Sequence, residues 1–176
     1  QGPVGPPASL RPEQLAQRVE DWATWKIGRS LVAPVPPDLP VRFEAVRADG
    51  GAGPLRPGDQ VSLTVRSDAG RRLYLTLLAL GDDGQSQLLY PPQQGSKPYL
   101  KPFGTFRFPV RMELPEGRTR SAKWVRLIAT TEPTPMHLLV TSGRGGWRLP
   151  AGRMLVLERE LVVAPPARSA EPQPGG

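Results

Sequence analysis

The sequence predicts an all-β fold, a sandwich of about seven to nine short strands with one helix near its N-terminus. Residues 61–66 alternate apolar and polar side chains, which is the period-two pattern of a strand with one solvent-exposed face. Residues 73–80 are apolar almost throughout, which favours a strand in mid-sheet that is covered on both faces. Similar runs recur at short spacing with turn residues between them, and this favours a sandwich over a barrel.

The expected strands follow one another along the middle of the chain. They cover residues 41–45, 61–66, 73–80, 88–91, 105–114, 123–130, 136–141 and 154–163. Residues 93–104 are expected to form a polar loop. Pro109 removes one backbone donor from its strand, so that strand is expected at a sheet edge or a bulge.

Composition divides the chain into a β-domain with appendages. The expected order is an extended tail (1–9), an amphipathic helix (10–28), a proline-rich linker (29–40), the β-sandwich (41–163) and a second extended or disordered tail (164–176). The 23 prolines and 19 glycines are concentrated in the two ends and a few loops, which supports these boundaries. No hydrophobic run approaches the roughly 20 residues needed to span a bilayer.

The predicted helix carries two neighbouring tryptophans, Trp22 and Trp25. Pro12 suits its first turn, and Gly28 is placed to end it. One face holds Leu15, Val19, Trp22, Ala23 and Ile27, with Trp25 on the flank. A single helix of this length needs a cover for its apolar face, so it packs on its own β-domain or docks in a partner's groove.

The chain is basic, with a formal net charge of +7, but its arginines are scattered rather than clustered. This pattern favours a solvated surface over a nucleic-acid site. The absence of cysteine excludes disulfides, thiolate metal ligands and a Cys nucleophile. The chain begins at Gln1 rather than Met, for which a cleaved signal peptide and a trimmed chain are both explanations.

No constellation of residues indicates catalysis, a cofactor or a metal. His137 is the only histidine, and no serine lies in a Gly-x-Ser-x-Gly elbow. Asp82 and Asp83 are flanked by glycines, which is typical of a hairpin turn rather than of a carboxylate pair across a cleft. Glu158 and Glu160 share one face of a strand, which is typical of an exposed edge.

The segment 142–153 is glycine-rich, basic and aromatic. Because it lacks a Gly-Lys-Ser/Thr ending and an expected strand follows it, it does not predict a phosphate-binding loop. Arg144, Trp147 and Arg148 nonetheless make it a candidate for contact with a ligand or partner.

Residues 55–131 resemble a bacterial family known only as a domain of unknown function, which occurs in exported proteins and behind caspase-like peptidase domains. The resemblance rests on Pro57-Gly58-Asp59, Tyr74-Leu75, Asp83-Gly84, Leu88-Leu89-Tyr90-Pro91, Arg107-Phe108-Pro109 and the strand 125–130. The family's usual Asn after the aromatic–Pro pair is Pro92 here. The resemblance implies a non-catalytic, immunoglobulin-like β-sandwich and supplies no active-site residues.

The expected function is therefore that of a non-catalytic interaction or structural protein, not an enzyme. It would act as an accessory subunit of a larger assembly in the bacterial periplasm, at the cell surface or in the secreted fraction. The candidate contacts with a protein partner are Trp22, Trp25, Arg144, Trp147 and Arg148. The alternative is a module that binds a glycan or another acidic polymer through Arg and aromatic groups at its loop ends, with Tyr90, Tyr99 and Trp147 as stacking platforms.

Overall fold

The computed structural model describes residues 13, 22–23, 25–33, 35–36, 38–51, 53–91, 99–133 and 153–165. Within them lie eight strands. These are β1 (Val41–Arg47), β2 (Gln60–Ser67), β3 (Leu73–Gly81), β4 (Ser86–Tyr90), β5 (Tyr99–Leu100), β6 (Thr105–Arg111), β7 (Ser121–Thr130) and β8 (Met154–Val163). In this part of the chain no helix has the length and apolar character needed to cross a membrane.

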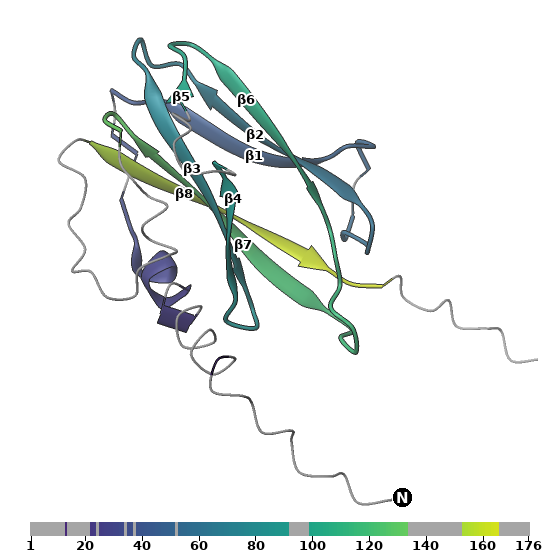
Figure 1. The fold of residues 1–176 in the computed structure, drawn as a ribbon. Helices are drawn as coiled ribbons and strands as arrows, with labels where there is room; N and C mark the ends of the chain where they lie inside the picture. Colours follow the sequence, from purple (N-terminus) through teal and green to yellow (C-terminus); the bar gives the residue numbers. More distant parts are fainter. Residues whose placement is uncertain are drawn as a thin grey trace, which may run out of the picture.

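The strands form two stacked antiparallel sheets, so the predicted all-β sandwich is confirmed (Figure 1). One sheet has the order β1-β2-β6. The other has the order β4-β3-β7-β8, and the short β5 also pairs with β3. These orders correspond to strands A-B-E and C′-C-F-G of the immunoglobulin-like sandwiches.

The period-two pattern of each strand places one set of side chains between the two sheets. In the smaller sheet, Phe43 and Phe106 flank Val65 across three strands. In the larger sheet, Leu77 lies opposite Leu127, which lies opposite Leu157. Most of these side chains belong to one continuous buried core, so the apolar residues are used to hold the sheets together.

Two predictions about strand position are confirmed. The apolar strand β3 lies in mid-sheet between β4 and β7, and β6, which contains Pro109, lies at the edge of its sheet. Several strand ends differ from the prediction by one or two residues, and two differences are larger. The expected polar loop 93–104 contains β5, and β6 ends at Arg111, although Met112 stays buried and exchanges backbone hydrogen bonds with Gly58 and Asp59. The strand expected at 136–141 and both expected tails lie outside the described residues, apart from the start of the second tail.

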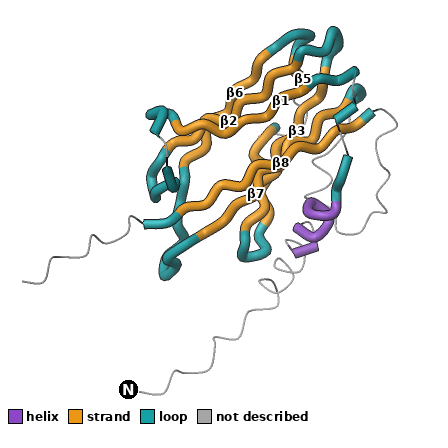
Figure 2. Tube along the Cα trace, turned by 180° about the vertical axis from the view of Figure 1, so that it is seen from behind, coloured by secondary structure: helices purple, strands orange, loops and turns teal. Residues whose placement is uncertain are grey.

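The N-terminal helix, which includes residues 22, 23 and 25–30, lies against the outer face of the larger sheet (Figure 2). It continues past Gly28, which therefore does not end the helix as predicted. A Cβ atom at Gly28 would lie 2.9 Å from Leu78 Cδ2 and 3.1 Å from Leu80 Cδ2, both on β3. Gly28 is thus needed for close approach of helix and sheet rather than for termination.

The linker 29–40 is likewise part of the fold rather than a free spacer. The backbone N–H of Val156 on β8 donates to the carbonyl of Ala33 (3.0 Å), so the linker covers part of the edge of β8. Leu39 is 1% exposed and belongs to the core between the sheets. The first two residues assigned to the linker, Arg29 and Ser30, are helical.

Candidate interaction surfaces

Trp25 fixes the N-terminal helix to the β-domain. Its indole Nε1–H donates a 2.7 Å hydrogen bond to the carbonyl of Gly81, at the end of β3. Two residues further along the helix, Ile27 packs against the fully buried Ile128 of β7. Of the two arrangements that the sequence left open, the structure shows the helix packed on its own domain.

Arg126 of the larger sheet binds the C-terminal end of this helix through hydrogen bonds. It lies in β7, is 8% exposed, and donates from its guanidinium to the carbonyls of Gly28 and Leu31, the latter at 2.6 Å. Its Nε–H donates to Glu158 of β8 (2.7 Å). A cation placed against the unpaired carbonyls of a helix end is favoured by the helix dipole.

Glu158 joins the helix and the sheet in one ion network. Besides Arg126, it accepts a 3.0 Å hydrogen bond from Arg29 of the helix, whose guanidinium also lies 4.6 Å from the ring centre of Trp124. The prediction of a plain exposed edge is therefore wrong at Glu158, because the helix covers this part of β8. Glu160 is exposed, as expected.

Trp22 is the more exposed of the two predicted tryptophans, with 54% of its surface accessible. The ammonium of Lys26 lies 4.8 Å from its ring centre. The ring also lies close to Gly84 in the turn between β3 and β4. Trp22 therefore presents most of its surface to solvent beside this turn.

The β3–β4 turn has the hairpin character that its sequence predicts. Asp82 accepts hydrogen bonds from Arg118 (2.7 Å) and from the backbone of Ala122 (3.1 Å), while Asp83 accepts one from the backbone of Gln85 (3.1 Å). Both carboxylates thus stabilise connections between strands. Among the described residues, no group of three or more acidic or histidine side chains is arranged to hold a metal.

An open groove lies beside β4 and is lined by residues of both sheets. Its larger part, about 490 Å³, is lined by the β3–β4 turn, the start of β4, residues 113–115 and the start of β7. Its smaller part, about 260 Å³, has an apolar floor that includes Leu89, Phe108 and Val110. The two parts share Ala79, Gln87, Glu113 and Lys123, and we call them together the β4 groove.

β4 is an edge strand of the described sheet, and its residues Ser86, Gln87 and Leu89 line this groove. The backbone N–H of Gly81 donates to the carbonyl of Gln85 (2.8 Å), and Leu80 is next opposite Ser86. Because hydrogen-bonded and non-hydrogen-bonded pairs alternate in an antiparallel ladder, the backbone groups of Ser86 and Leu88 are directed away from β3. The Ser86 hydroxyl oxygen is buried and has no hydrogen-bond partner in the described part of the chain.

Of the other residues predicted to contact a ligand or partner, only some lie in the described part of the chain. Arg144, Trp147 and Arg148 lie outside the described residues, as does His137. Tyr90, a candidate stacking platform, instead packs against Phe106 with 4.6 Å between ring centres, and burial raises the pKa of its hydroxyl. Tyr99 is 42% exposed and carries the guanidinium of Arg72 over its ring at 4.3 Å.

No protein-family profile matches this sequence, and no curated protein is significantly similar to it. Two solved structures are similar in outline. Structural-genomics target SoR45 is 9% identical, with 78% of this chain and 93% of that chain covered and a TM-score of 0.36. The protein assigned as ApaA in Bordetella pertussis is 16% identical, with 79% and 100% covered and a TM-score of 0.36. At these scores neither structure informs the function, and the family resemblance of residues 55–131 stays a prediction.

Proposed function

We propose that this chain is a non-catalytic interaction module that binds an extended segment of a partner protein along β4. The observation that carries the proposal is a short edge strand with outward-directed backbone groups, beside an open groove with an apolar floor. A segment added to such an edge gains main-chain hydrogen bonds, and its alternate side chains enter the adjacent groove.

The groove offers chemistry that could select such a segment. Leu89, Phe108 and Val110 favour an apolar side chain, while Glu113 and Lys123 place one charge of each sign where the two parts of the groove meet. This combination of an apolar centre and a polar rim is common in protein–protein interfaces.

Trp22 extends this surface past the β3–β4 turn. The turn supplies Asp83 and Gln85 to the groove on one side and Gly84 to the contact with Trp22 on the other. Exposed tryptophans are over-represented among the residues that dominate binding energy. The proposal thus keeps Trp22 as a partner contact and gives Trp25 a role in holding the helix.

Site-specific photo-crosslinking in the cells that make the protein tests this proposal. A photoreactive phenylalanine analogue at position 87 is expected to yield a discrete adduct with one partner, identified by mass spectrometry. The matched control is position 46, because Val46 is 49% exposed on the outer face of the other sheet. Trp22→Ala is expected to lower the yield from position 87 at least fivefold. Identical adducts from both positions, or none from position 87, would contradict the proposal.

The proposed compartment is the cell envelope or the secreted fraction, and the partner would be part of a larger assembly there. This part rests on the family resemblance of the sequence. Fractionation of the cells tests it, with the periplasmic and surface fractions expected to contain the protein. Of the platforms named for the glycan-binding alternative, Tyr90 packs against Phe106 and Trp147 lies outside the described residues, which leaves Tyr99 as the exposed one.

A further inference from the structure

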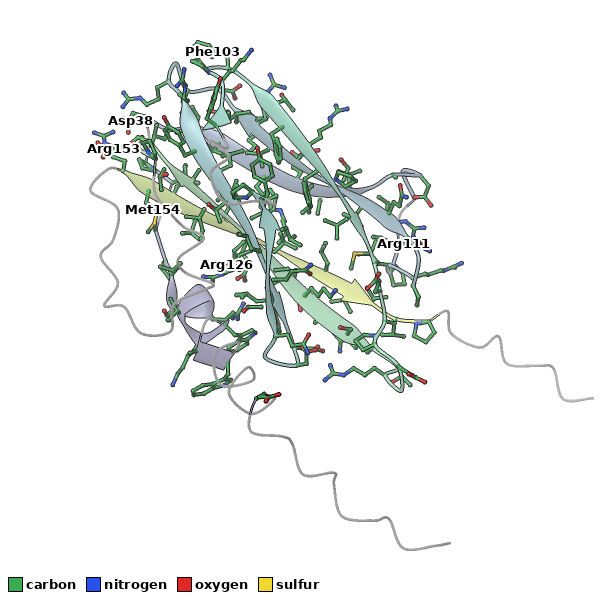
Figure 3. All side chains as sticks on the ribbon, in the orientation of Figure 1. Asp38, Phe103, Arg111, Arg126, Arg153 and Met154 are labelled. Atoms are coloured by element: carbon green, nitrogen blue, oxygen red, sulfur yellow. The ribbon has the colours of Figure 1, made fainter. Side chains whose placement is uncertain are left out.

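Phe103 is exposed at the end of the sandwich opposite the β4 groove (Figure 3). It is 72% exposed, more than any other described aromatic side chain, and its backbone has a φ of 55°. This left-handed conformation is uncommon for a bulky residue, and it costs free energy unless its surroundings impose it.

Backbone contacts on both sides hold Phe103 in this conformation. Its N–H donates to the carbonyl of Ala69 (3.1 Å), and the next N–H, of Gly104, donates to the carbonyl of Lys101 (3.0 Å). The ring lies over Gly70, where a Cβ atom would be 3.4 Å from Phe103 Cζ. The connection before β6 is therefore hydrogen-bonded to the β2–β3 connection. The ring of Phe103 lies on the surface rather than in the core.

Residues 66–72 and 99–104, which comprise these two connections, the end of β2 and the short β5, carry several cations, and we call this region the tip. Lys101 and Arg71 are exposed and make no ion pair with any described residue. The guanidinium of Arg72 lies over the ring of Tyr99. Arg66 lies opposite Arg42 in the sheet register and forms a 3.4 Å ion pair with Asp68, the carboxylate of the tip. Within these two segments, four cations (Arg66, Arg71, Arg72 and Lys101) accompany one carboxylate, Asp68.

This combination of groups matches the chemistry of an anionic bilayer surface. A phenyl ring without polar groups gains free energy at the boundary between headgroups and acyl chains, and neighbouring Lys and Arg side chains are attracted by acidic headgroups. Attraction to an acidic polymer in water would account for the cations alone. It would not account for a phenyl ring that the backbone holds in solvent.

We propose that the tip docks on anionic phospholipid membranes, with Phe103 entering the interface and Arg71 and Lys101 contacting the headgroups. The tip and the β4 groove lie at opposite ends of β3 and β6 (Figure 1). A molecule docked in this way leaves the groove directed away from the membrane and open to a partner. The two proposals therefore stand or fall separately.

Co-sedimentation of the full chain with vesicles tests the tip. Binding is expected to vesicles that contain phosphatidylglycerol in phosphatidylcholine, to weaken as salt is added, and to be absent with phosphatidylcholine alone. Equal binding to both vesicle types would overturn the proposal. Retention on heparin without sedimentation with anionic vesicles would also overturn it, and would assign the cations to an acidic polymer.

Three variants locate the site. Phe103→Asn is expected to reduce partitioning of the protein onto anionic vesicles about tenfold. The substitution removes the apolar ring, and asparagine tolerates the left-handed backbone conformation. Phe103→Gly provides a second variant that suits this conformation. Lys101→Gln is expected to reduce partitioning about fivefold.

The matched control is Arg111→Gln, an exposed cation at the far end of β6, which is expected to bind as the parent does. Unfolding curves establish that the variants are folded. Undiminished binding by both Phe103 variants, or an equal loss in Arg111→Gln, would remove the tip as the docking site.

Discussion

Arg126 shows how strongly a single buried cation depends on groups from distant parts of the chain. Its guanidinium is surrounded by carbonyls of the N-terminal helix and the carboxylate of Glu158, so each nitrogen involved has an acceptor. A buried cation without acceptors is costly, and removal of one partner from such a set costs more than the set contributes in total.

Arg126→Met tests this network at the level of stability. We expect the free energy of unfolding to fall by about 3 kcal/mol, because the carbonyls of Gly28 and Leu31 lose their donor and Glu158 keeps only Arg29. Urea denaturation measures the change. Arg159→Met is the control, since Arg159 is an exposed neighbour on β8 whose loss is expected to cost less than about 0.5 kcal/mol. Equal losses in the two variants would show that the network contributes nothing specific.

Tyr90 makes stability depend on pH at the alkaline end. Burial raises its pKa in the folded chain, so the folded state keeps its proton at a pH where the unfolded state has released it. This contribution is complete below the unfolded pKa of about 10 and is lost as pH rises through the folded value. The parent is therefore expected to lose stability above about pH 10 relative to Tyr90→Phe. A difference between the two that stays constant with pH would contradict this assignment.

At the scale of one element, the N-terminal helix is placed by three contacts that short-range sequence pattern does not contain. The indole of Trp25 reaches the end of β3, Gly28 allows close approach to the leucines of β3, and Arg126 binds the last carbonyls. The two tryptophans consequently differ in role although they lie close together in the sequence.

Substitution of each tryptophan separates these roles. Trp25→Phe keeps an aromatic ring but loses the hydrogen bond to Gly81, and it is expected to lower the free energy of unfolding by roughly 1–2 kcal/mol. Trp22→Ala is expected to change stability by less than about 0.5 kcal/mol, because the side chain is mostly in solvent. The reverse order, measured by thermal and urea unfolding, would mean that Trp22 is the structural residue.

The elements that sequence predicts well are those defined by local pattern. The alternation in β2 and β6, the apolar run in β3 and the position of Pro109 give both strand identity and position in the sheet. β5 has only two residues, which is too short for an alternation of apolar and polar side chains to be recognised. Local pattern predicts a helix end at Gly28, whereas the close approach to β3 that requires this glycine depends on tertiary packing.

The candidate sites were harder to predict than the strands, because they depend on tertiary packing rather than on local sequence pattern. The β4 groove exists because β4 and β6 are edge strands on the same side of the sandwich, which requires the pairing of distant segments. A lone arginine within the apolar strand 121–130 was a usable signal for Arg126, since an unpaired charge is rare at such a position. The exposure of Phe103 depends on a backbone conformation that its sequence does not indicate.

At the scale of the whole molecule, the described chain is a three-layer arrangement of two sheets and one covering helix (Figure 2). The helix closes part of the outer face of the larger sheet. The two proposed contact regions then lie at the ends of the sandwich, with the β4 groove and Trp22 at one end and the tip at the other. This arrangement requires the helix to be a stable part of the domain.

Residue-resolved hydrogen exchange of the free protein tests that requirement most directly. The backbone amides near the end of the helix, with the N–H of Leu31 bonded to Ile27, are expected to show protection approaching that of β3 and β7. The same amides are expected to lose protection in Arg126→Met. Helix amides that exchange freely while β3 and β7 stay protected would contradict the account, because the outer face of the larger sheet would then be open to a partner.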